Sequence, residues 1–293
     1  MVSLLKRYPA ITIGIFFLGI WMLVWYLFSI LNLWGDMHGC AIPGNDPCFC
    51  EYADAFQLIA EPINAWSNFY YIGAGFIILI YHDLERNEKI SKREDYLSKE
   101  GNTHYAVAYG ILVVWVGIGS FLMHAVRRGN TSYLDVMSMN TYICGVLVMA
   151  ISIRFNLKKE QFYMALFFSF FISEVLSKFF GHTYVFVGIV ILVFINEMAI
   201  SLGIYSKVFK KHPPRNIKPN FPLLFVIVGL FLLAFYVWQF GHTEHPYCDP
   251  YSLWQWHTVW HFLTAVCTVL IFLYIKLEKE KELTSSESIN KEN

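Results

Sequence analysis

Long apolar runs, separated by short polar segments, occupy most of the chain between residues 10 and 276. A helix that crosses a membrane needs about 20 mostly apolar residues in a row, because its backbone polar groups must bond within the segment. The runs that meet this requirement are 10–32, 63–82, 104–126, 132–153, 160–178, 182–205, 220–240 and 254–276. The pattern therefore predicts an all-α membrane protein with eight spans.

The composition agrees with a protein that lies within a bilayer. Only 15% of the residues are charged and 56% are hydrophobic, whereas globular domains carry about 25% charged residues. Basic and acidic residues balance at 22 each, so no net charge attracts nucleic acid. The chain also has 9 Trp and 18 Tyr, residue types that are enriched where proteins meet the membrane interface.

The distribution of basic residues predicts the orientation. Lysine and arginine are frequent before the first span, in alternate loops and after the last span, at 6–7, 86–99, 154–159, 207–218 and beyond 276. The loops 33–62 and 241–253, on the other side, contain neither residue type, and Arg127–Arg128 is the exception. Because basic loops face the cytoplasm, we expect both termini to be cytoplasmic.

Four segments follow from this topology. Residues 1–35 form an N-terminal membrane anchor, since no small-residue cleavage site follows the first span. Residues 36–62 form an acidic, cysteine-containing, non-cytoplasmic loop, and residues 63–276 form a bundle of seven helices. The Ser-, Glu- and Lys-rich residues 277–293 are expected to be a disordered tail.

Polar side chains inside spans mark candidate functional sites, because they are costly in lipid. Ser120 and His124 are four residues apart near the end of the third span, so they share one helix face. Asp135 follows in the first turn of the fourth span, after a short loop. Short loops join antiparallel neighbours, so Asp135 is expected near the level of His124.

The last span begins with a second histidine pattern, His257 and His261. A pair spaced i, i+4 gives a metal two imidazoles from one helix face, although two interfacial histidines beside tryptophans can also be polar tips. Thr258 stands where the zincin motif has its glutamate base. An even number of spans separates His124 from His257, so all three histidines are expected at one membrane depth, which indicates a catalytic Zn²⁺ site.

Other polar residues have simpler interpretations. Glu174, Asn196 and Glu197 are predicted to form helix–helix hydrogen bonds, with lining of a polar cavity as the second interpretation. Histidines at span ends and in loops are expected at the surface or in solvent, namely His38, His82, His104, His212, His242 and His245. For His242 and His245, support of the metal ligands is the second interpretation. Glu61, beside the second span, could help to hold a hard cation through oxygen.

The cysteines divide according to the topology. Cys144 and Cys267 lie within spans, where cysteine behaves as a small buried hydrophobe. The other four lie on the expected oxidising side, at Cys40, Cys48, Cys50 and Cys248. Four cysteines there indicate two disulfides. A bridge between Cys48 and Cys50 is geometrically unfavourable, so Cys248 is expected to pair with the 33–62 loop.

These motifs together resemble a known family. They are Cys50-Glu51, the segment Glu61-Pro-Ile-Asn-Ala-Trp-Ser67-Asn68, Gly119-Ser120, His124, Asp135 and the pair His257 and His261. The combination resembles the alkaline ceramidases, part of a superfamily of seven-span membrane hydrolases that includes adiponectin-receptor-like proteins. The resemblance covers residues 48–276 and leaves the first span outside.

The resemblance implies a zinc amidase that cuts the N-acyl bond of ceramide to a sphingoid base and a fatty acid. His124, His257 and His261 match the zinc ligands, Asp135 the residue beside the reacting water, and Ser120 the oxyanion donor. A Ca²⁺ site is also implied, with Glu51 and Glu61 as ligands. Cys48 replaces an acidic ligand of that site, for which Asp54 is the substitute. Further implications are a Cys50–Cys248 disulfide and, from the cysteines that remain, a Cys40–Cys48 bridge.

Two other functions are compatible with the same residues. One is an acyl-ester or phospholipid hydrolase with the same apparatus. The other is a membrane receptor or transporter in which the metal is structural. All three interpretations share a membrane lipid environment, and an enzyme is favoured because three histidines leave a metal position open.

Overall fold

The computed structural model describes residues 7–36, 49–54, 56–87, 97, 102–208, 217–277 and 279–280. Within these ranges, eight helical spans are long and apolar enough to cross a membrane, which confirms the all-α membrane fold. The helices are α2 (Pro9–Ile30), α3 (Pro62–Ser67), α4 (Phe69–Arg86), α5 (Thr103–Val126), α6 (Thr131–Phe155), α7 (Lys159–Phe180), α8 (His182–Ser201), α9 (Ile204–Val208), α10 (Phe221–Gln239) and α11 (Trp256–Lys276). The two-residue strands β1 (Ile217–Lys218) and β2 (Lys279–Glu280) pair antiparallel.

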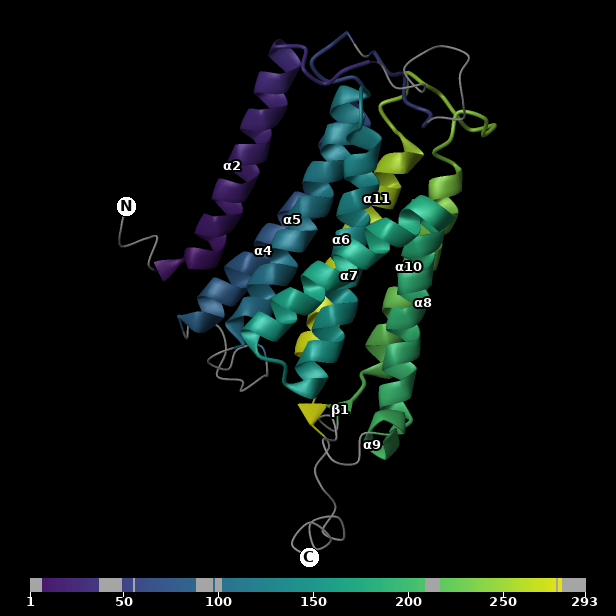
Figure 1. Ribbon diagram of the computed structural model, residues 1–293. Helices are drawn as coiled ribbons and strands as arrows, with labels where there is room; N and C mark the ends of the chain where they lie inside the picture. The colour runs from purple at the N-terminus through teal and green to yellow at the C-terminus, as the bar shows by residue number, and fades with distance from the viewer. Residues whose placement is uncertain are drawn as a thin grey trace, which may run out of the picture.

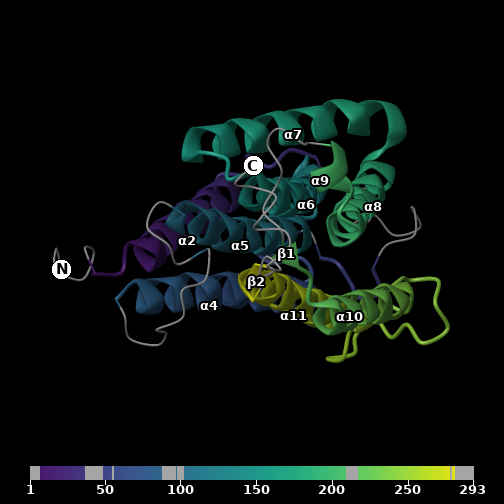
Figure 2. The same ribbon diagram turned by 90° about the horizontal axis from the view of Figure 1, so that it is seen from below.

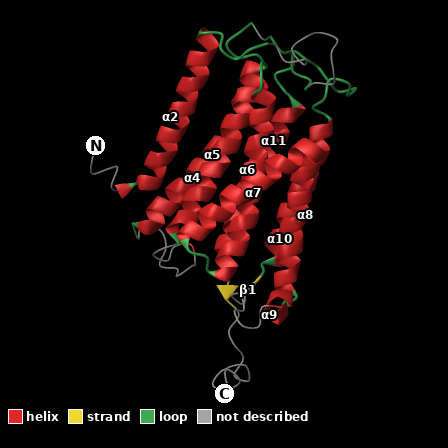
Figure 3. Cartoon of the chain, viewed as in Figure 1, coloured by secondary structure: helices red, strands yellow, loops and turns green. Residues whose placement is uncertain are grey.

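The long helices run side by side, with the loops that carry residues 49–61 and 241–255 gathered at one end (Figures 1 and 3). Seen along the bundle, α4, α11 and α10 form one layer and α5 and α6 lie behind it, with α7 and α8 beyond α6 (Figure 2). From Val113 to Val126, every residue of α5 is buried. The central helix of the bundle is therefore α5, whose last turn carries His124.

Glycine allows α5 to lie very close to its neighbour α6. A Cβ atom at Gly119 would lie 2.5 Å from the Ser138 hydroxyl oxygen and 2.8 Å from the Leu134 carbonyl oxygen. A larger residue there would push the two helices apart. The close approach sets the separation between Ser120 on α5 and Asp135 on α6.

Two predicted spans differ from the observed helices in detail. The second span is broken, because α3 ends at Ser67 and α4 begins at Phe69. The sixth span, expected to reach residue 205, ends at Ser201, and Gly203 takes a left-handed φ of 64° before α9. The surface positions expected for His82 and His104 are wrong, since both side chains are buried among helices.

Helix α2 docks on α4 and α5 through both apolar and polar contacts. The Trp21 and Trp115 rings lie 4.9 Å apart. At its start, Tyr8 offers no side-chain cap. The buried Asp83 carboxylate of α4 accepts the free backbone N–H groups of Ala10 at 3.3 Å and Ile11 at 2.9 Å. Asp83 thus caps a helix other than its own.

Two loops are joined covalently at the end of the bundle that lies opposite the start of α2 and the end of α11 (Figure 1). Cys50 and Cys248 form a disulfide, as the resemblance implies, across a sequence separation of 198. The backbone N–H of Cys50 donates to the Gly241 carbonyl at 2.7 Å, and Phe49 bridges to His242. Cys144 and Cys267 are buried free thiols. The expected Cys40–Cys48 bridge lies outside the described residues.

We expect Asp83→Ala to destabilise the packing of α2. The change leaves two backbone N–H groups of α2 without their acceptor, which costs about 1–2 kcal/mol, so Tm in detergent should fall. Asp83→Asn keeps one acceptor oxygen and should lower Tm less. Equal Tm values for all three proteins would show that α2 is held by apolar contacts alone.

Loss of the outer disulfide should lower stability strongly. A bridge across 198 residues contributes about 5 kcal/mol in the chain-entropy model, so Cys248→Ser should lower Tm well below that of the parent. Cys144→Ala removes a buried free thiol and serves as the control with a small effect. Peptide mapping without reductant should find Cys50 joined to Cys248; a Cys50 that can be alkylated in the folded protein contradicts this.

Candidate metal centre

Three buried histidines converge at the loop-covered end of the bundle. His124 comes from the last turn of α5, and His257 and His261 from the first two turns of α11. One nitrogen from each ring lies within 4.8 Å of the others. The structure therefore brings together the three histidines that the sequence spacing and the even number of intervening spans predict to lie at one depth.

The spacing of the rings fits a metal ion. The Nε2 atoms of His124 and His257 lie 3.2 Å apart. Two imidazole nitrogens bound tetrahedrally at about 2.0–2.1 Å from a Zn²⁺ ion are separated by about 3.3 Å. The pair is thus already at the distance that a shared ion requires.

Glu61 fixes the protonation of His124. Its carboxylate Oε2 lies 2.6 Å from His124 Nδ1, and its Oε1 lies 2.9 Å from Arg127 Nε. Burial raises the pKa of the Glu61 carboxyl, but Arg127 and His124 outweigh burial, and the net pKa is below the usual value. An ionised carboxylate only accepts hydrogen bonds, so Nδ1 of His124 carries the proton and Nε2 presents its lone pair to the ion.

Ser67 does the same for His261 by a different route. Its hydroxyl donates to the Asn64 carbonyl at 2.7 Å and lies 2.6 Å from His261 Nδ1. Since the one hydroxyl proton is used on Asn64, the hydroxyl oxygen accepts the proton on Nδ1. The His261 Nε2 is therefore unprotonated, as a metal ligand must be. The short helix α3 carries Asn64 and Ser67 and so places the Ser67 hydroxyl at His261 Nδ1.

Phe49 covers the histidines on the loop side. Its ring centroid lies 3.7 Å from that of His257 and 5.2 Å from that of His124. His242, expected in solvent, is half-buried and stacks on the Phe49 ring, with the two ring centroids 5.7 Å apart. The Cys50–Cys248 disulfide adjoins Phe49 and holds it in place. The His257 Nδ1 atom is buried with no hydrogen-bond partner among the described residues.

Ser120 and Asp135 lie together beside the histidines. The Asp135 carboxyl interacts with the Ser120 hydroxyl and electrostatically with His124 and Arg127. Ser120 is buried, whereas Asp135 is partly exposed. An acid and a hydroxyl thus lie next to the metal-binding nitrogens without being ligands in the cluster.

The three carboxylates predicted for Ca²⁺ already have protein partners. Both oxygens of Glu51 accept backbone N–H groups at the start of α3, from Ile63 and Asn64 at 2.7 Å each. Burial raises the pKa of Glu51, and these two N–H groups oppose that effect. Asp54 accepts hydrogen bonds within its own loop, from Phe56 and Gln57. Calcium binding by Glu51, Glu61 and Asp54 stays a prediction.

An apolar cavity of about 500 Å³ lies within the bundle, and its lining includes Tyr71, whose ring centroid is 5.9 Å from that of His261. Tyr71 and Thr264, which are hydrogen-bonded to each other, line the part of the cavity near His261, and Thr264 is one turn along α11 from His261. The cavity continues between α6, α8, α10 and α11, with side chains that are almost all apolar. The three histidines, Ser120 and Asp135 are not among the residues that line the cavity, whereas Tyr71 and Thr264, which adjoin His261, are.

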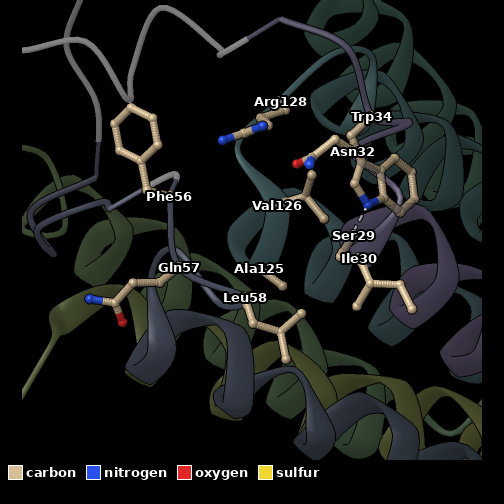
Figure 4. A pocket seen from close by; sticks show the side chains of 10 residues that line it. All are labelled: Ser29, Ile30, Asn32, Trp34, Phe56, Gln57, Leu58, Ala125, Val126 and Arg128. Atoms are coloured by element: carbon tan, nitrogen blue, oxygen red, sulfur yellow. Dashed lines mark hydrogen bonds between the residues drawn. The ribbon is translucent and has the colours of Figure 1, made fainter.

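A smaller hollow of about 220 Å³ lies at the loop end, between the end of α2, the loop 56–58 and the end of α5 (Figure 4). Its lining consists of Ser29, Ile30, Asn32, Trp34, Phe56, Gln57, Leu58, Ala125, Val126 and Arg128. The Trp34 indole N–H donates to the Ser29 hydroxyl at 3.0 Å. None of the predicted site residues lines this hollow.

Sequence reasoning missed Ser67, Arg127 and Phe49. Ser67 belongs to the segment that carries the family resemblance, but its role depends on a hydrogen bond across 194 residues. The sequence does single out Arg127, because it lies in a loop on the expected non-cytoplasmic side, where basic residues are rare. The structure explains this exception, because Arg127 is not exposed to solvent but is buried and paired with Glu61.

Comparison with known proteins identifies the family. A family model described as Ceramidase matches residues 47–291. The matched range begins after α2 and includes every residue of the metal centre. A search of curated proteins finds no significant match. Because the family match covers most of the chain, the chain belongs to the Ceramidase family, and this makes it a hydrolase that acts on the amide bond of ceramide.

Proposed function

We propose that this protein is a zinc-dependent intramembrane lipid amidase, which hydrolyses the N-acyl bond of ceramide or a ceramide-like lipid to a sphingoid base and a fatty acid. The observation that carries the proposal is the convergence of His124, His257 and His261 beside Asp135 and Ser120. Tyr71 and Thr264, which adjoin His261, line an apolar cavity, so the metal-binding centre and the acid–base group lie next to a lipid-sized space.

The donor set favours Zn²⁺. Three neutral imidazoles are typical of catalytic zinc centres and leave a further position open, and imidazole suits zinc better than Ca²⁺ or Mg²⁺. When bound there, Zn²⁺ supplies Lewis acidity and makes water nucleophilic near neutral pH. Glu61 and Ser67 hold the histidine rings in the tautomers that bind it.

Asp135 and Ser120 have distinct roles in the proposal. The Asp135 carboxylate orients the attacking water and takes its proton, then returns it to the leaving amine. The Ser120 hydroxyl donates to the carbonyl oxygen as negative charge develops on it. The interaction between the two side chains keeps both groups close to the same space before the substrate arrives.

The cavity supplies the fit to a lipid. An amide placed at the histidines lets one hydrocarbon chain enter the apolar space between α6, α8, α10 and α11. Side chains that line it on α8 and α10 are also exposed on the outside of the bundle, including Ile191 and Leu232. Since these helices face the bilayer, a lipid can enter the cavity sideways from the membrane.

We also propose that the metal centre faces the non-cytoplasmic side, with both termini in the cytoplasm. The basic loops support this orientation. The Cys50–Cys248 disulfide supports it independently, because it lies at the end of the bundle that carries the metal centre, and disulfides persist in oxidising compartments.

Substitution of Asp135 and Ser120 should separate catalysis from metal binding. Asp135→Asn should keep one equivalent of zinc per chain but lose turnover of ceramide, because it removes the base and no ligand. Ser120→Ala should lower kcat by roughly one to three decades at unchanged zinc content. The control is His257→Ala, which should lose the metal. Equal zinc loss in the Asp135 or Ser120 variant contradicts these roles.

Ser67→Ala should weaken zinc binding without any change to a ligand. Loss of the acceptor for His261 Nδ1–H is expected to lower zinc affinity about 10- to 100-fold, measured by competition with a chelator. Ser120→Ala is the matched control, since the same hydroxyl deletion there touches no histidine partner. Identical affinities for the two variants would show that Ser67 does not orient His261.

A further inference from the structure

The cavity below the metal centre has a defined far end. On α11 its lining runs from Trp260 to Ile275, which spans about 22 Å at 1.5 Å per residue. At the far end it reaches Ala150 on α6 and Glu197 on α8. Glu197 is the single charged side chain among the described residues that line it.

Glu197 belongs to a buried polar cluster that closes this end. Its Oε2 accepts hydrogen bonds from Arg154 Nη2 at 2.8 Å and from the Tyr274 hydroxyl at 2.7 Å, and its Oε1 accepts from Asn196 at 3.2 Å. Arg154 also donates to the Ala150 carbonyl at 2.9 Å. The cluster joins α6, α8 and α11 across the width of the cavity.

The walls above this cluster offer an apolar chain no comparable obstacle. The hydroxyl groups that line them are engaged in hydrogen bonds, Tyr142 with Tyr109 at 2.8 Å and Tyr71 with Thr264. The far end of the cavity is different, because an apolar chain that entered it would have to separate the buried ion pair of Arg154 and Glu197. Leaving one charge of such a pair without its partner costs far more than burial of one or two methylenes gains.

We propose that the Arg154–Glu197–Tyr274 cluster, with Ala150 and Ile275 above it, is a stop that sets the longest hydrocarbon chain the cavity accepts. An extended chain advances about 1.25 Å per methylene, so a length of about 22 Å corresponds to about 16 to 18 carbons. The inference rests on the proposed function only for the identity of the lipid. The stop itself follows from the closed end of the cavity.

Two isoleucines on one face of α11 provide a matched test. Ile271 and Ile275 are four residues apart and both line the cavity, Ile271 on the wall and Ile275 at the far end. Ile275→Ala deepens the cavity and should move the upper length limit to chains about two carbons longer. Ile271→Ala removes the same atoms from the wall and should leave the limit unchanged. Ala150→Leu fills the end and should shorten the limit by about two carbons.

The limit is read from binding, by native mass spectrometry of the purified protein with an equimolar mixture of saturated fatty acids that differ by two carbons. The expected result is a sharp loss of retained acid above about 18 carbons that shifts in the two end variants alone. An unchanged limit in Ile275→Ala, or equal shifts in both isoleucine variants, overturns the stop.

Hydrolysis of N-acyl lipids is measured separately on the same proteins. If the binding limit shifts as stated while no N-acyl lipid is cleaved, the stop stands and the amidase proposal fails. If N-acyl lipids are cleaved while the binding limit does not move, the amidase proposal stands and the stop fails.

Discussion

The completely buried carboxylate of Glu61 is the interaction on which the metal-binding end of this protein depends. A charge in such a position is stable only with partners, and Glu61 has three, His124, Arg127 and Asn64. Its own backbone N–H donates to the His124 carbonyl at 3.1 Å. One side chain therefore joins the start of α3 to the end of α5 and also sets the tautomer of a metal-binding histidine.

The remaining parts of the site are arranged around that joint. Helix α3 places Ser67 against His261, and the close approach of α5 and α6 at Gly119 places Ser120 against Asp135. Phe49, held beside the Cys50–Cys248 disulfide, covers the rings from the loop side. The apolar cavity is lined by Tyr71 and Thr264, which adjoin His261. The centre is thus covered by Phe49 and lies beside an apolar cavity.

The sequence predicts the spans and the histidine cluster because both follow from strong constraints. A bilayer demands apolar helices of a minimum length, and alternate span ends lie on the same side of the membrane, so His124 and His257 are placed at the same end of the bundle. The break at Asn68 and the path of Phe49 over the rings depend on loop conformation, which hydropathy does not encode. His82 and His104 looked like surface residues because span-end positions are ambiguous, yet neighbouring helices cover both.

Zinc K-edge X-ray absorption of the purified protein shows whether three imidazoles form a metal centre with an open position. We expect three imidazole nitrogens and one light-atom ligand that a soluble hydroxamate displaces, with one imidazole lost in His261→Ala. A spectrum with sulfur ligands, or with four protein nitrogens and no response to hydroxamate, would contradict it.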